Sequence, residues 1–336
     1  MINKCEPYQN FSPCFSIIIL FWNSHKYIKK CLTSIQNQTF IDFEIILIDN
    51  GSIIGIDKEL FLEFQNLNIN YFLLEKNLGF AAANNFGASK ARGDYLVLLN
   101  SDAFPKSDWL DNVKTSIEKY PNSFFASKLL MANDDSKLDG TGDVYHASGI
   151  VWRKNYEHKV RKVAENEVEV FSACAAAAVY PKYAFEEVGG FDEDYFAYVE
   201  DVDLGFRLRL AGYKCIFLPD AVVYHVGSGS TGKRSDFSVY YGQRNLVWTF
   251  IKDMPGVLFW ILLPGHIVVN LLLIVLSIFR KQGRIVLQAK IDGLSHMIGI
   301  INKRRKIQKS RKVSIWEILK MIDWNPISPI LKILSK

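Results

Sequence analysis

The chain has 336 residues, of which 49% are hydrophobic and 22% charged. This length and composition allow a sizeable buried core and argue against a disordered protein, leaving room for one large α/β domain with an appendage. The formal net charge is +5, and the cysteines (Cys5, Cys14, Cys31, Cys174 and Cys215) form no Cys-x-x-Cys pair, which argues against a zinc ribbon or a disulfide framework and favours a reducing cytosol.

Short β-branched runs alternate with helical periods from Phe15 onwards, as in βαβ units around a parallel sheet. The predicted strands are residues 15–21, 43–48, 69–74 and 95–99. Between the first two, a helix is expected to cover the sheet with one apolar face, formed by Ile28, Cys31, Leu32 and Ile35. Lys4 is the only basic residue before Cys14, and the apolar run that follows Cys14 has no small-residue cleavage site, so we expect no signal peptide.

Polar residues follow each predicted strand: Asn23, residues 49–52, residues 77–79 and residues 100–102. Ligands of such sheets bind beyond the carboxyl ends of the strands. Turns favour the same residue types, so each cluster alone is open to a structural interpretation, whereas four at one edge favour a ligand site. Asp102 is a hard oxygen ligand suited to Mg²⁺ or Mn²⁺, and Asp49 is placed to accept hydrogen bonds from a base or ribose.

The regular alternation fades after about residue 150, and a second group of polar motifs follows. Glycine and acidic residues gather at 189–194, and acidic residues again at 200–203. A helix is predicted over 202–211, ending at Gly212, and a strand over 221–226. His225 then lies near the end of that strand, where it is either a packed, hydrogen-bonded residue or a ligand.

The C-terminal region is apolar and then basic. Residues 257–279 are almost continuously apolar and long enough to span a bilayer, but Pro264-Gly265 interrupts the run, and an amphipathic period follows at Leu287, Ile291, Leu294, Ile298 and Ile301. Residues 280–312 hold eleven Lys or Arg and the single acid Asp292, so their net charge is +10 and that of the rest of the chain is about −5. This pattern favours an anionic membrane surface over nucleic acid, with a solvated helical face as the alternative.

The ordered set of motifs supports a more specific interpretation. These motifs are Ser16 to Asn23, Ile48-Asp-Asn-Gly-Ser52, Asn77-Leu-Gly-Phe-Ala81 with Asn84-Asn85, Leu99-Asn-Ser-Asp-Ala103, Gly189-Gly-Phe-Asp-Glu193, Phe196 to Leu204, Gly212-Tyr213 and His225. In this order the chain resembles family 2 glycosyltransferases of the GT-A fold, close to the rhamnosyltransferase-like branch, over residues 14 to 250. The resemblance implies a Rossmann-like, mostly parallel α/β sheet in a catalytic domain of residues 1–250, followed by a helical membrane-associated region of residues 251–336.

The resemblance also implies roles for individual residues. The nucleotide sugar would bind Asn23, Asp49, Asn77, Gly79, Asn100 and Asp102. Asp102 resembles the last acid of an Asp-x-Asp metal motif whose first acid is here Asn100, so Asp102 and His225 would hold the Mg²⁺ or Mn²⁺. Asp201 resembles the general base of an inverting transfer. Glu200 or Asp203 would share that work, or would simply lie in the first turn of a helix, where acids are favoured.

Two further strings narrow the interpretation. Residues 227–233 fit the first seven positions of a phosphate-binding P-loop, but Arg234 replaces the Ser or Thr that binds magnesium. A loop that closes on the donor diphosphate, with Lys233 or Arg234 lending charge, is favoured instead. The Gln-x-x-Arg-Trp motif of processive members is absent from residues 243–248, which favours transfer of one sugar or a few rather than polymerisation.

The expected activity is therefore transfer of a sugar from a nucleotide-diphosphate donor to a hydroxyl of a saccharide or lipid-linked acceptor, in surface polysaccharide synthesis. The resemblance favours dTDP-rhamnose, with UDP-sugars as alternatives. A nucleotidyltransferase of α/β fold and a non-catalytic GT-A binding module are the competing functions. Nucleotide sugars and the positive-inside bias both require the cytosol, so a hairpin or peripheral attachment to the cytoplasmic face is expected rather than a single crossing.

Overall fold

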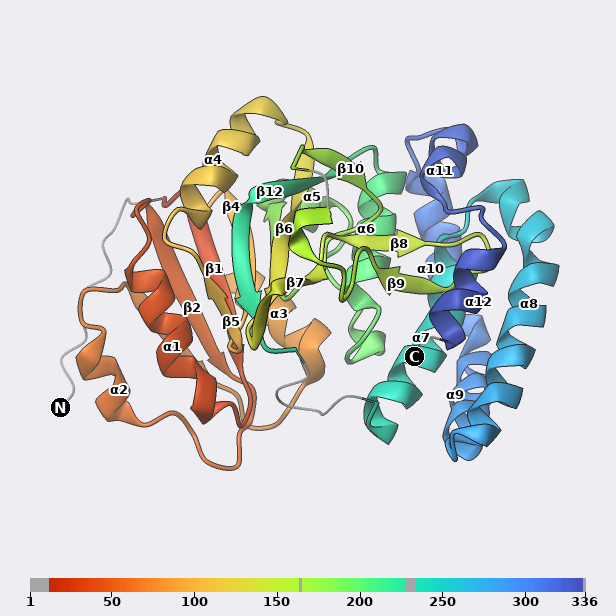
Figure 1. Cartoon of the computed structure of the whole chain (residues 1–336), viewed down its shortest axis with the longest axis horizontal. Helices are drawn as coiled ribbons and strands as arrows, with labels where there is room; N and C mark the ends of the chain where they lie inside the picture. The colour runs from red at the N-terminus through yellow and green to blue at the C-terminus, as the bar shows by residue number, and fades with distance from the viewer. Residues whose placement is uncertain (1–11, 163–164, 228–233, 335–336) are drawn as a thin grey trace.

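The structure is a computed structural model that describes residues 12–162, 165–227 and 234–334 (Figure 1). Lys4, Cys5 and residues 228–233 of the Gly/Ser loop, including Lys233, lie outside the described residues.

The N-terminal half forms the parallel part of the central sheet (Figure 1). β1 (Phe15–Phe21) lies between β2 (Phe43–Asp49) and β4 (Tyr95–Asn100), and β3 (Ile69–Leu73) pairs with β2. The four predicted strands are confirmed to within one residue at their ends. Phe21 pairs with Asp49, and Leu20 pairs with Asn100, so the polar residues that follow these strands meet at one edge of the sheet.

Helices cover both faces of this part of the sheet. α1 (His25–Gln36) buries the four apolar residues predicted from the sequence against one face. α3 (Gly79–Lys90) packs on the other face and approaches it closely, because a Cβ at Gly87 would lie only 2.6 Å from Cγ2 of Ile18. The remaining α-helices before the C-terminal group are α2 (Lys58–Glu63), α4 (Trp109–Lys119), α5 (Lys182–Glu187) and α6 (Glu200–Leu210).

The region after β4 extends the sheet with mixed pairing. Its strands are β5 (Ala103–Pro105), β6 (Ser123–Met131), β7 (Asp134–Gly140), β8 (Asp143–Tyr145), β9 (Val151–Arg153), β10 (Val168–Val170), β11 (Ala177–Pro181) and β12 (Lys214–His225). In the described residues the order of the central sheet is β10-β12-β6-β11-β4-β1-β2-β3, with β5 on β12 and β7 on β6, and β8 and β9 form a separate two-stranded sheet. The strand predicted over 221–226 is the second half of β12, which already begins at Lys214. A register shift separates Leu218 from Val222 and hides the first half from simple alternation.

The C-terminal helices gather at the end of the molecule opposite β2 and α2 (Figure 1). They are α7 (Asp236–Asp253), α8 (Gly256–Phe279), α9 (Gly283–Ser295), α10 (Met297–Ser310), α11 (Ile315–Met321) and α12 (Ile327–Leu334). Residue 250, where the sequence places a domain boundary, lies inside α7. One hydrophobic cluster joins Tyr145 of β8 and Phe206 of α6 to Phe250 and Ile300, so the C-terminal helices share a core with the rest of the chain.

α8 runs unbroken through Pro264 and Gly265, so these residues interrupt the apolar run of the sequence but not the helix. A proline inside a helix removes one backbone hydrogen bond, but packing holds the helix on both sides of it. Leu258 is buried before the proline, and the His266 ring stacks on Phe250 after it, with centroids 4.0 Å apart. Within the described residues α8 is the helix that by length and apolar composition could cross a membrane, and only 17% of its most apolar window is buried.

Candidate active site

A pocket of about 470 Å³ opens at the carboxyl edge of the parallel strands. Side chains that follow β1, β2 and β4 line one side of it, and the loop before α6 with the first turn of α6 lines the other. Seven of the residues singled out in the sequence line this pocket: Asn77, Gly79, Asn100, Asp102, Glu200, Asp201 and His225. The fold therefore brings most of the widely separated candidate residues into one cavity.

Asn23 and Asp49 lie at the same edge of the sheet but do not line this pocket. Asp49 is fully buried; its Oδ1 accepts a hydrogen bond from the Ser52 amide at 2.9 Å, and its Oδ2 accepts one from the Tyr71 hydroxyl at 3.3 Å. Asn23 has a positive φ of 52°, and its amide donates to Ser52 Oγ while its Oδ1 accepts from the Ile53 amide, both at 3.0 Å. Both residues brace the turn after β2, and their contact with a nucleotide stays a prediction.

Asn50 and Asn77 fix the loop that precedes α3. Asn50 Nδ2 donates to Asn77 Oδ1 at 3.1 Å, and Asn50 Oδ1 accepts from the Leu78 amide at 2.9 Å. Gly79 has a φ of +85°, and a Cβ there would lie 2.6 Å from the Phe196 ring. Because only glycine fits such a conformation without strain, Gly79 allows the loop to close against the wall of the pocket. Asn50 itself lines the pocket, although no separate role was predicted for it.

Asp102 and His225 face one another across the pocket edge. Antiparallel pairing of β5 with β12 places His225 opposite Ala103, and His225 Nε2 lies 3.4 Å from Asp102 Oδ1. On the far side of the ring, Nδ1 lies 2.7 Å from Asp139 Oδ2, and Asp139 is ion-paired with Arg153. Burial would lower the pKa of His225, but the contacts with Asp102 and Asp139 outweigh it and raise the pKa above its ordinary value.

This arrangement fits a divalent cation. A histidine that binds a metal through one ring nitrogen usually gives the other to a carboxylate that fixes its orientation, as Asp139 does here for His225. Within the described part of the chain, no group of three or more His, Cys, Asp or Glu side chains is arranged to hold a metal. Asp102 and His225 would therefore supply two ligands, and substrate phosphate oxygens and water would complete the shell, as is usual for Mg²⁺.

Three carboxyl groups gather on the other side of the pocket. Asp143 and Glu200 are buried, whereas Asp201 is partly exposed to the cavity. Burial and the nearby Asp201 raise the pKa of Asp143 to about 8 and that of Glu200 well above its ordinary value. Burial also raises the pKa of Asp201, but the amides of Ala175 and Val202 donate to its two oxygens at 3.1 and 2.9 Å. Since such donors stabilise the ionised form, Asp201 is the carboxylate best placed to accept a proton.

The loop before α6 is held in a rarely populated backbone conformation. Phe196, Tyr198 and Val199 have φ angles of 63°, 67° and 68°, which β-branched and bulky residues seldom adopt. Asn245 of α7 opposes this strain, because its Nδ2 lies 2.7 to 3.0 Å from the carbonyl oxygens of Tyr195, Ala197 and Tyr198. A C-terminal helix thus shapes the wall that carries Glu200 and Asp201.

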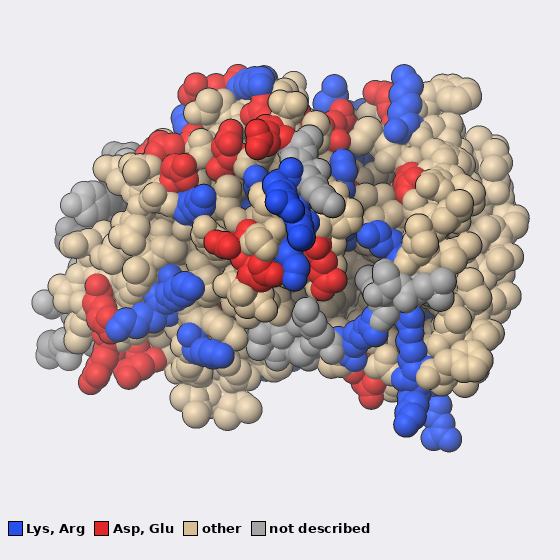
Figure 2. All heavy atoms as spheres, in the orientation of Figure 1, with Lys and Arg blue, Asp and Glu red and all other residues tan. Residues whose placement is uncertain are grey.

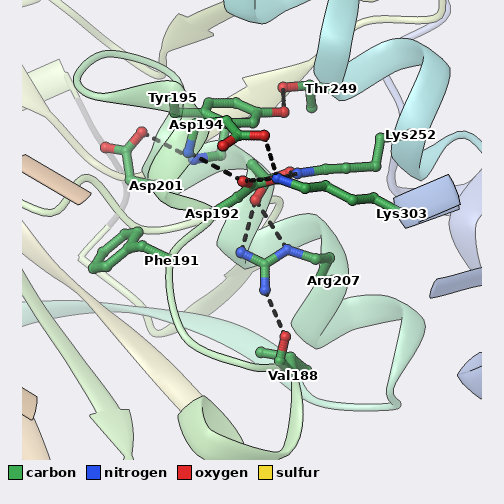
Figure 3. A network of polar contacts seen from close by, with 12 residues as sticks. Val188, Phe191, Asp192, Asp194, Tyr195, Asp201, Arg207, Thr249, Lys252 and Lys303 are labelled. Carbon is green, nitrogen blue, oxygen red and sulfur yellow. Dashed lines mark hydrogen bonds and ion pairs between the residues drawn. The ribbon is translucent and has the colours of Figure 1, made fainter. Parts of the chain in front are cut away.

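A buried ion-pair network behind this loop ties α6 to α7 and α10 (Figure 3). Lys252, whose side chain is 1% exposed, pairs with Asp192 and Asp203, and Asp203 also pairs with Arg207. Lys303 of α10 reaches Asp192 as well. Arg207 and Lys252 lower the pKa of Asp203 despite its burial. Asp203 does not line the pocket. Its position therefore favours the second of the two roles left open by the sequence, a residue of the first helical turn rather than a partner of the general base.

The sequence did not identify Asp139, Asp143 and Arg153. All three lie on the short strands β7, β8 and β9, where alternation is weak, and no motif marks them. Their one signal in the sequence is that two acids flank the Gly140-Thr-Gly142 turn.

Comparisons with known families agree on the class of protein. The sequence model of Glycosyl transferase family 2 matches residues 16–189, which is more than half of the chain, and that of Glycosyl transferase family group 2 matches residues 153–280. The N-acetylglucosaminyl-diphospho-decaprenol L-rhamnosyltransferase of Mycobacterium tuberculosis is 24% identical over 239 residues, which cover 65% of this chain and 77% of the relative. Glycosyltransferase GlyG of Streptococcus pneumoniae is 23% identical, covering 72% of this chain and 80% of the relative.

Solved structures share the fold. The mannosyltransferase PcManGT of Pyrobaculum calidifontis, in complex with GDP-Man and Mn²⁺, aligns with a TM-score of 0.55 and 16% identity over 89% of this chain and 84% of the other. GalNAc-T7, solved with UDP, GalNAc and Mn²⁺, aligns with a TM-score of 0.59 and 19% identity over 71% of this chain. The match spans only 48% of that protein.

Proposed function

Because the chain belongs to glycosyl transferase family 2 and is a glycosyltransferase, we propose that it is an inverting, metal-dependent enzyme. It moves a sugar from a nucleotide-diphosphate donor to an acceptor hydroxyl in surface polysaccharide synthesis. The observation that carries the proposal is the pocket itself, which the adjacent pair Asp102 and His225 lines together with Asp201. A cation bound at the pair would neutralise charge that develops on the departing diphosphate.

The residues of the chain divide the remaining work. Asn50, Asn77 and Asn100 line the donor side and offer hydrogen-bonding groups to the nucleotide sugar. On the opposite side Asp201 takes the proton of the acceptor hydroxyl as that oxygen attacks the anomeric carbon, in a single displacement that inverts the configuration. Burial and the nearby Asp201 raise the pKa values of the neighbours Glu200 and Asp143, whereas the amides of Ala175 and Val202 stabilise the ionised form of Asp201.

The donor is proposed to be dTDP-rhamnose, with UDP-sugars as alternatives, and the acceptor a lipid-linked saccharide. The name of the Mycobacterium tuberculosis relative supports both choices, since it specifies rhamnosyl transfer and a decaprenol diphosphate. A thermal-shift screen of nucleotide sugars with Mn²⁺ tests the proposal. We expect one donor to raise the melting temperature in the presence of Mn²⁺, and the absence of stabilisation by any nucleotide sugar would contradict it.

Asp139→Asn is expected to weaken the affinity for Mn²⁺ by about 10- to 100-fold, the usual effect of removing a carboxylate that orients a metal-binding histidine. The reason is that His225 Nδ1 contacts Asp139 Oδ2. Electron paramagnetic resonance of free Mn²⁺, titrated in the presence of UDP, measures the affinity. Asp134→Asn is the matched control on the same strand, where the carboxylate pairs with Lys137 near the surface; equal Mn²⁺ affinity of the two variants would exclude an orienting role.

The enzyme is proposed to attach to the cytoplasmic face of the membrane without crossing it. α9 packs against both α7 and α8, and α10 packs against α6 and α7, which supports a chain that returns to the body after α8. Several basic residues of 280–312 are engaged inside the fold, among them Lys303 with Asp192, Lys312 with Glu187, and Arg304 with two carbonyl oxygens of the α7 end. The apolar face of α8 is therefore the main contact, and the remaining basic residues assist it.

Val268→Glu combined with Val275→Glu is expected to lower binding to phosphatidylglycerol vesicles by more than about tenfold, because both side chains lie on the exposed face of α8. Ile41→Glu, at an exposed residue of the N-terminal half, is the control. Vesicle sedimentation measures binding. Truncation after Lys252 is unsuitable as a test, since it removes Lys303, which pairs with Asp192 in the buried network. A C-terminal reporter found outside the cytosol would contradict the proposed attachment.

A further inference from the structure

A second hollow, of about 560 Å³, lies between α7, α8, α9 and α10 (hereafter the helical groove). It is lined almost throughout by apolar side chains, among them Phe259, Trp260, Leu263, Leu271, Leu294 and Ile301. Its volume lies in the range of sites that enclose most of a small ligand. The proposed transfer reaction makes no use of it.

One buried cation interrupts the apolar lining of the helical groove. Lys290 is 6% exposed, and its Nζ donates to the carbonyl oxygen of Gln243 at 2.7 Å. No acidic side chain pairs with it among the described residues, and burial lowers its pKa to about 7. An ammonium group in apolar surroundings is destabilised unless a counter-charge reaches it. Arg304 also lines the groove and donates through Nη1 to the carbonyls of Ile251 and Met254, so an anion in the groove would meet two basic side chains, of which Lys290 is the more deeply buried.

The outer wall of the helical groove is a surface that itself requires hydrocarbon surroundings. Trp260, Ile267 and Leu271 of α8 line the groove and are 69%, 50% and 58% exposed. In Figure 2 the right-hand edge, which α8 forms in Figure 1, is almost free of charged side chains. The apolar groove and the apolar outer face of α8 are therefore one continuous surface, so a lipid chain can enter the groove from a bilayer without crossing water.

α7 connects the helical groove to the active-site pocket. Phe237 at the start of α7 lines the active-site pocket, and Val247 and Ile251 near its end line the groove. Gln243, whose carbonyl holds Lys290, comes six residues after Phe237, which is about 9 Å along a helix. A phosphate at Lys290 would thus lie one short segment of polar substrate away from the pocket in which Asp201 accepts a proton.

We propose that the helical groove binds the single hydrocarbon chain of the lipid-linked acceptor, with the phosphate next to the chain held by Lys290 and the saccharide directed to the active-site pocket. This inference rests on the proposed function, which it deepens by naming the acceptor as one chain that carries a phosphate. The groove volume suits one chain, and the buried Lys290 suits a phosphate at its end.

Farnesyl diphosphate, a short and soluble prenyl diphosphate, is the probe, and calorimetry without any divalent metal measures its binding to the full chain. We expect it to bind more tightly than inorganic diphosphate or short-chain phosphatidylglycerol. Leu271→Glu should weaken binding at least tenfold, since each CH₂ group kept out of an apolar site weakens binding by about fourfold. Leu272→Glu is the matched control, because Leu272 is exposed beside it but does not line the groove. Lys290→Met should weaken binding of the diphosphate while keeping the side-chain volume.

Equal affinities of the Leu271→Glu and Leu272→Glu variants would overturn the proposal, as would inorganic diphosphate or phosphatidylglycerol that binds as tightly as farnesyl diphosphate. The first result would place the chain elsewhere, and the second would indicate a general anion or membrane-lipid site. Donor binding in the presence of Mn²⁺, measured on the same variants, separates this inference from the proposed function. If farnesyl diphosphate does not bind in the groove but the donor still binds, the proposed function stands. If farnesyl diphosphate binds but no donor does, the proposed function alone is refuted.

Discussion

Asp102→Ala is expected to abolish the metal-dependent part of donor binding. The carboxylate of Asp102 and Nε2 of His225, 3.4 Å apart, are the pair proposed to hold the cation that links the donor diphosphate to the protein. One histidine alone is a weak site for Mg²⁺ or Mn²⁺, which prefer oxygen ligands. Calorimetric affinity for the donor should then be the same with and without Mn²⁺ in the variant, and clearly different in the wild-type protein.

The Asp102→Ala variant should remain folded, because the substitution removes one carboxylate at the pocket edge and His225 keeps its contact with Asp139. Asp135→Ala, at an exposed position in β7, controls for the loss of a negative charge. A variant whose donor affinity still rises with Mn²⁺ to the wild-type extent would show that Asp102 does not hold the metal.

Asp201→Asn should keep donor binding and lower turnover by about 10² to 10⁴, the usual contribution of a positioned general base. The asparagine keeps the shape of the side chain and an oxygen for one of the amides of Ala175 and Val202, but it cannot take a proton. Since burial raises the pKa of Asp201, the wild-type rate should rise with pH as the carboxyl group ionises. Steady-state kinetics across pH measures both effects, and the rise should be lost in the variant.

Glu200→Gln and Asp143→Asn are the comparisons for the base. Both residues line the same pocket, and burial together with the nearby Asp201 raises the pKa of each. Smaller losses of turnover are therefore expected for them than for Asp201→Asn. Near wild-type turnover of Asp201→Asn would place the base elsewhere, with Glu200 the next candidate.

The first four strands and their covering helix could be predicted from the sequence because each depends on local pattern. The runs of Ile and Leu in β1, β2 and β4 are buried on both faces, so they read as short continuous apolar segments between turn residues. Parallel pairing of these strands is then enough to place the polar residues that follow them, Asn23, Asp49 and Asp102, at one edge of the sheet. The strands β8, β9 and β10 could not be predicted in this way, because each has only three residues, which are too few to show a pattern.

By itself the sequence determined the class of the protein, the strand-end acids and the ordered motifs that include Asp102, Asp201 and His225, since these are properties of residues and their spacing. Only the tertiary structure decided which side chains act beside them. Asp139 reaches His225 because β7 pairs with β6, which in turn pairs with β12, and Lys252 reaches Asp203 because α7 packs on α6. Such contacts join residues far apart in the chain, and their energies depend on burial and distance, which no local pattern encodes.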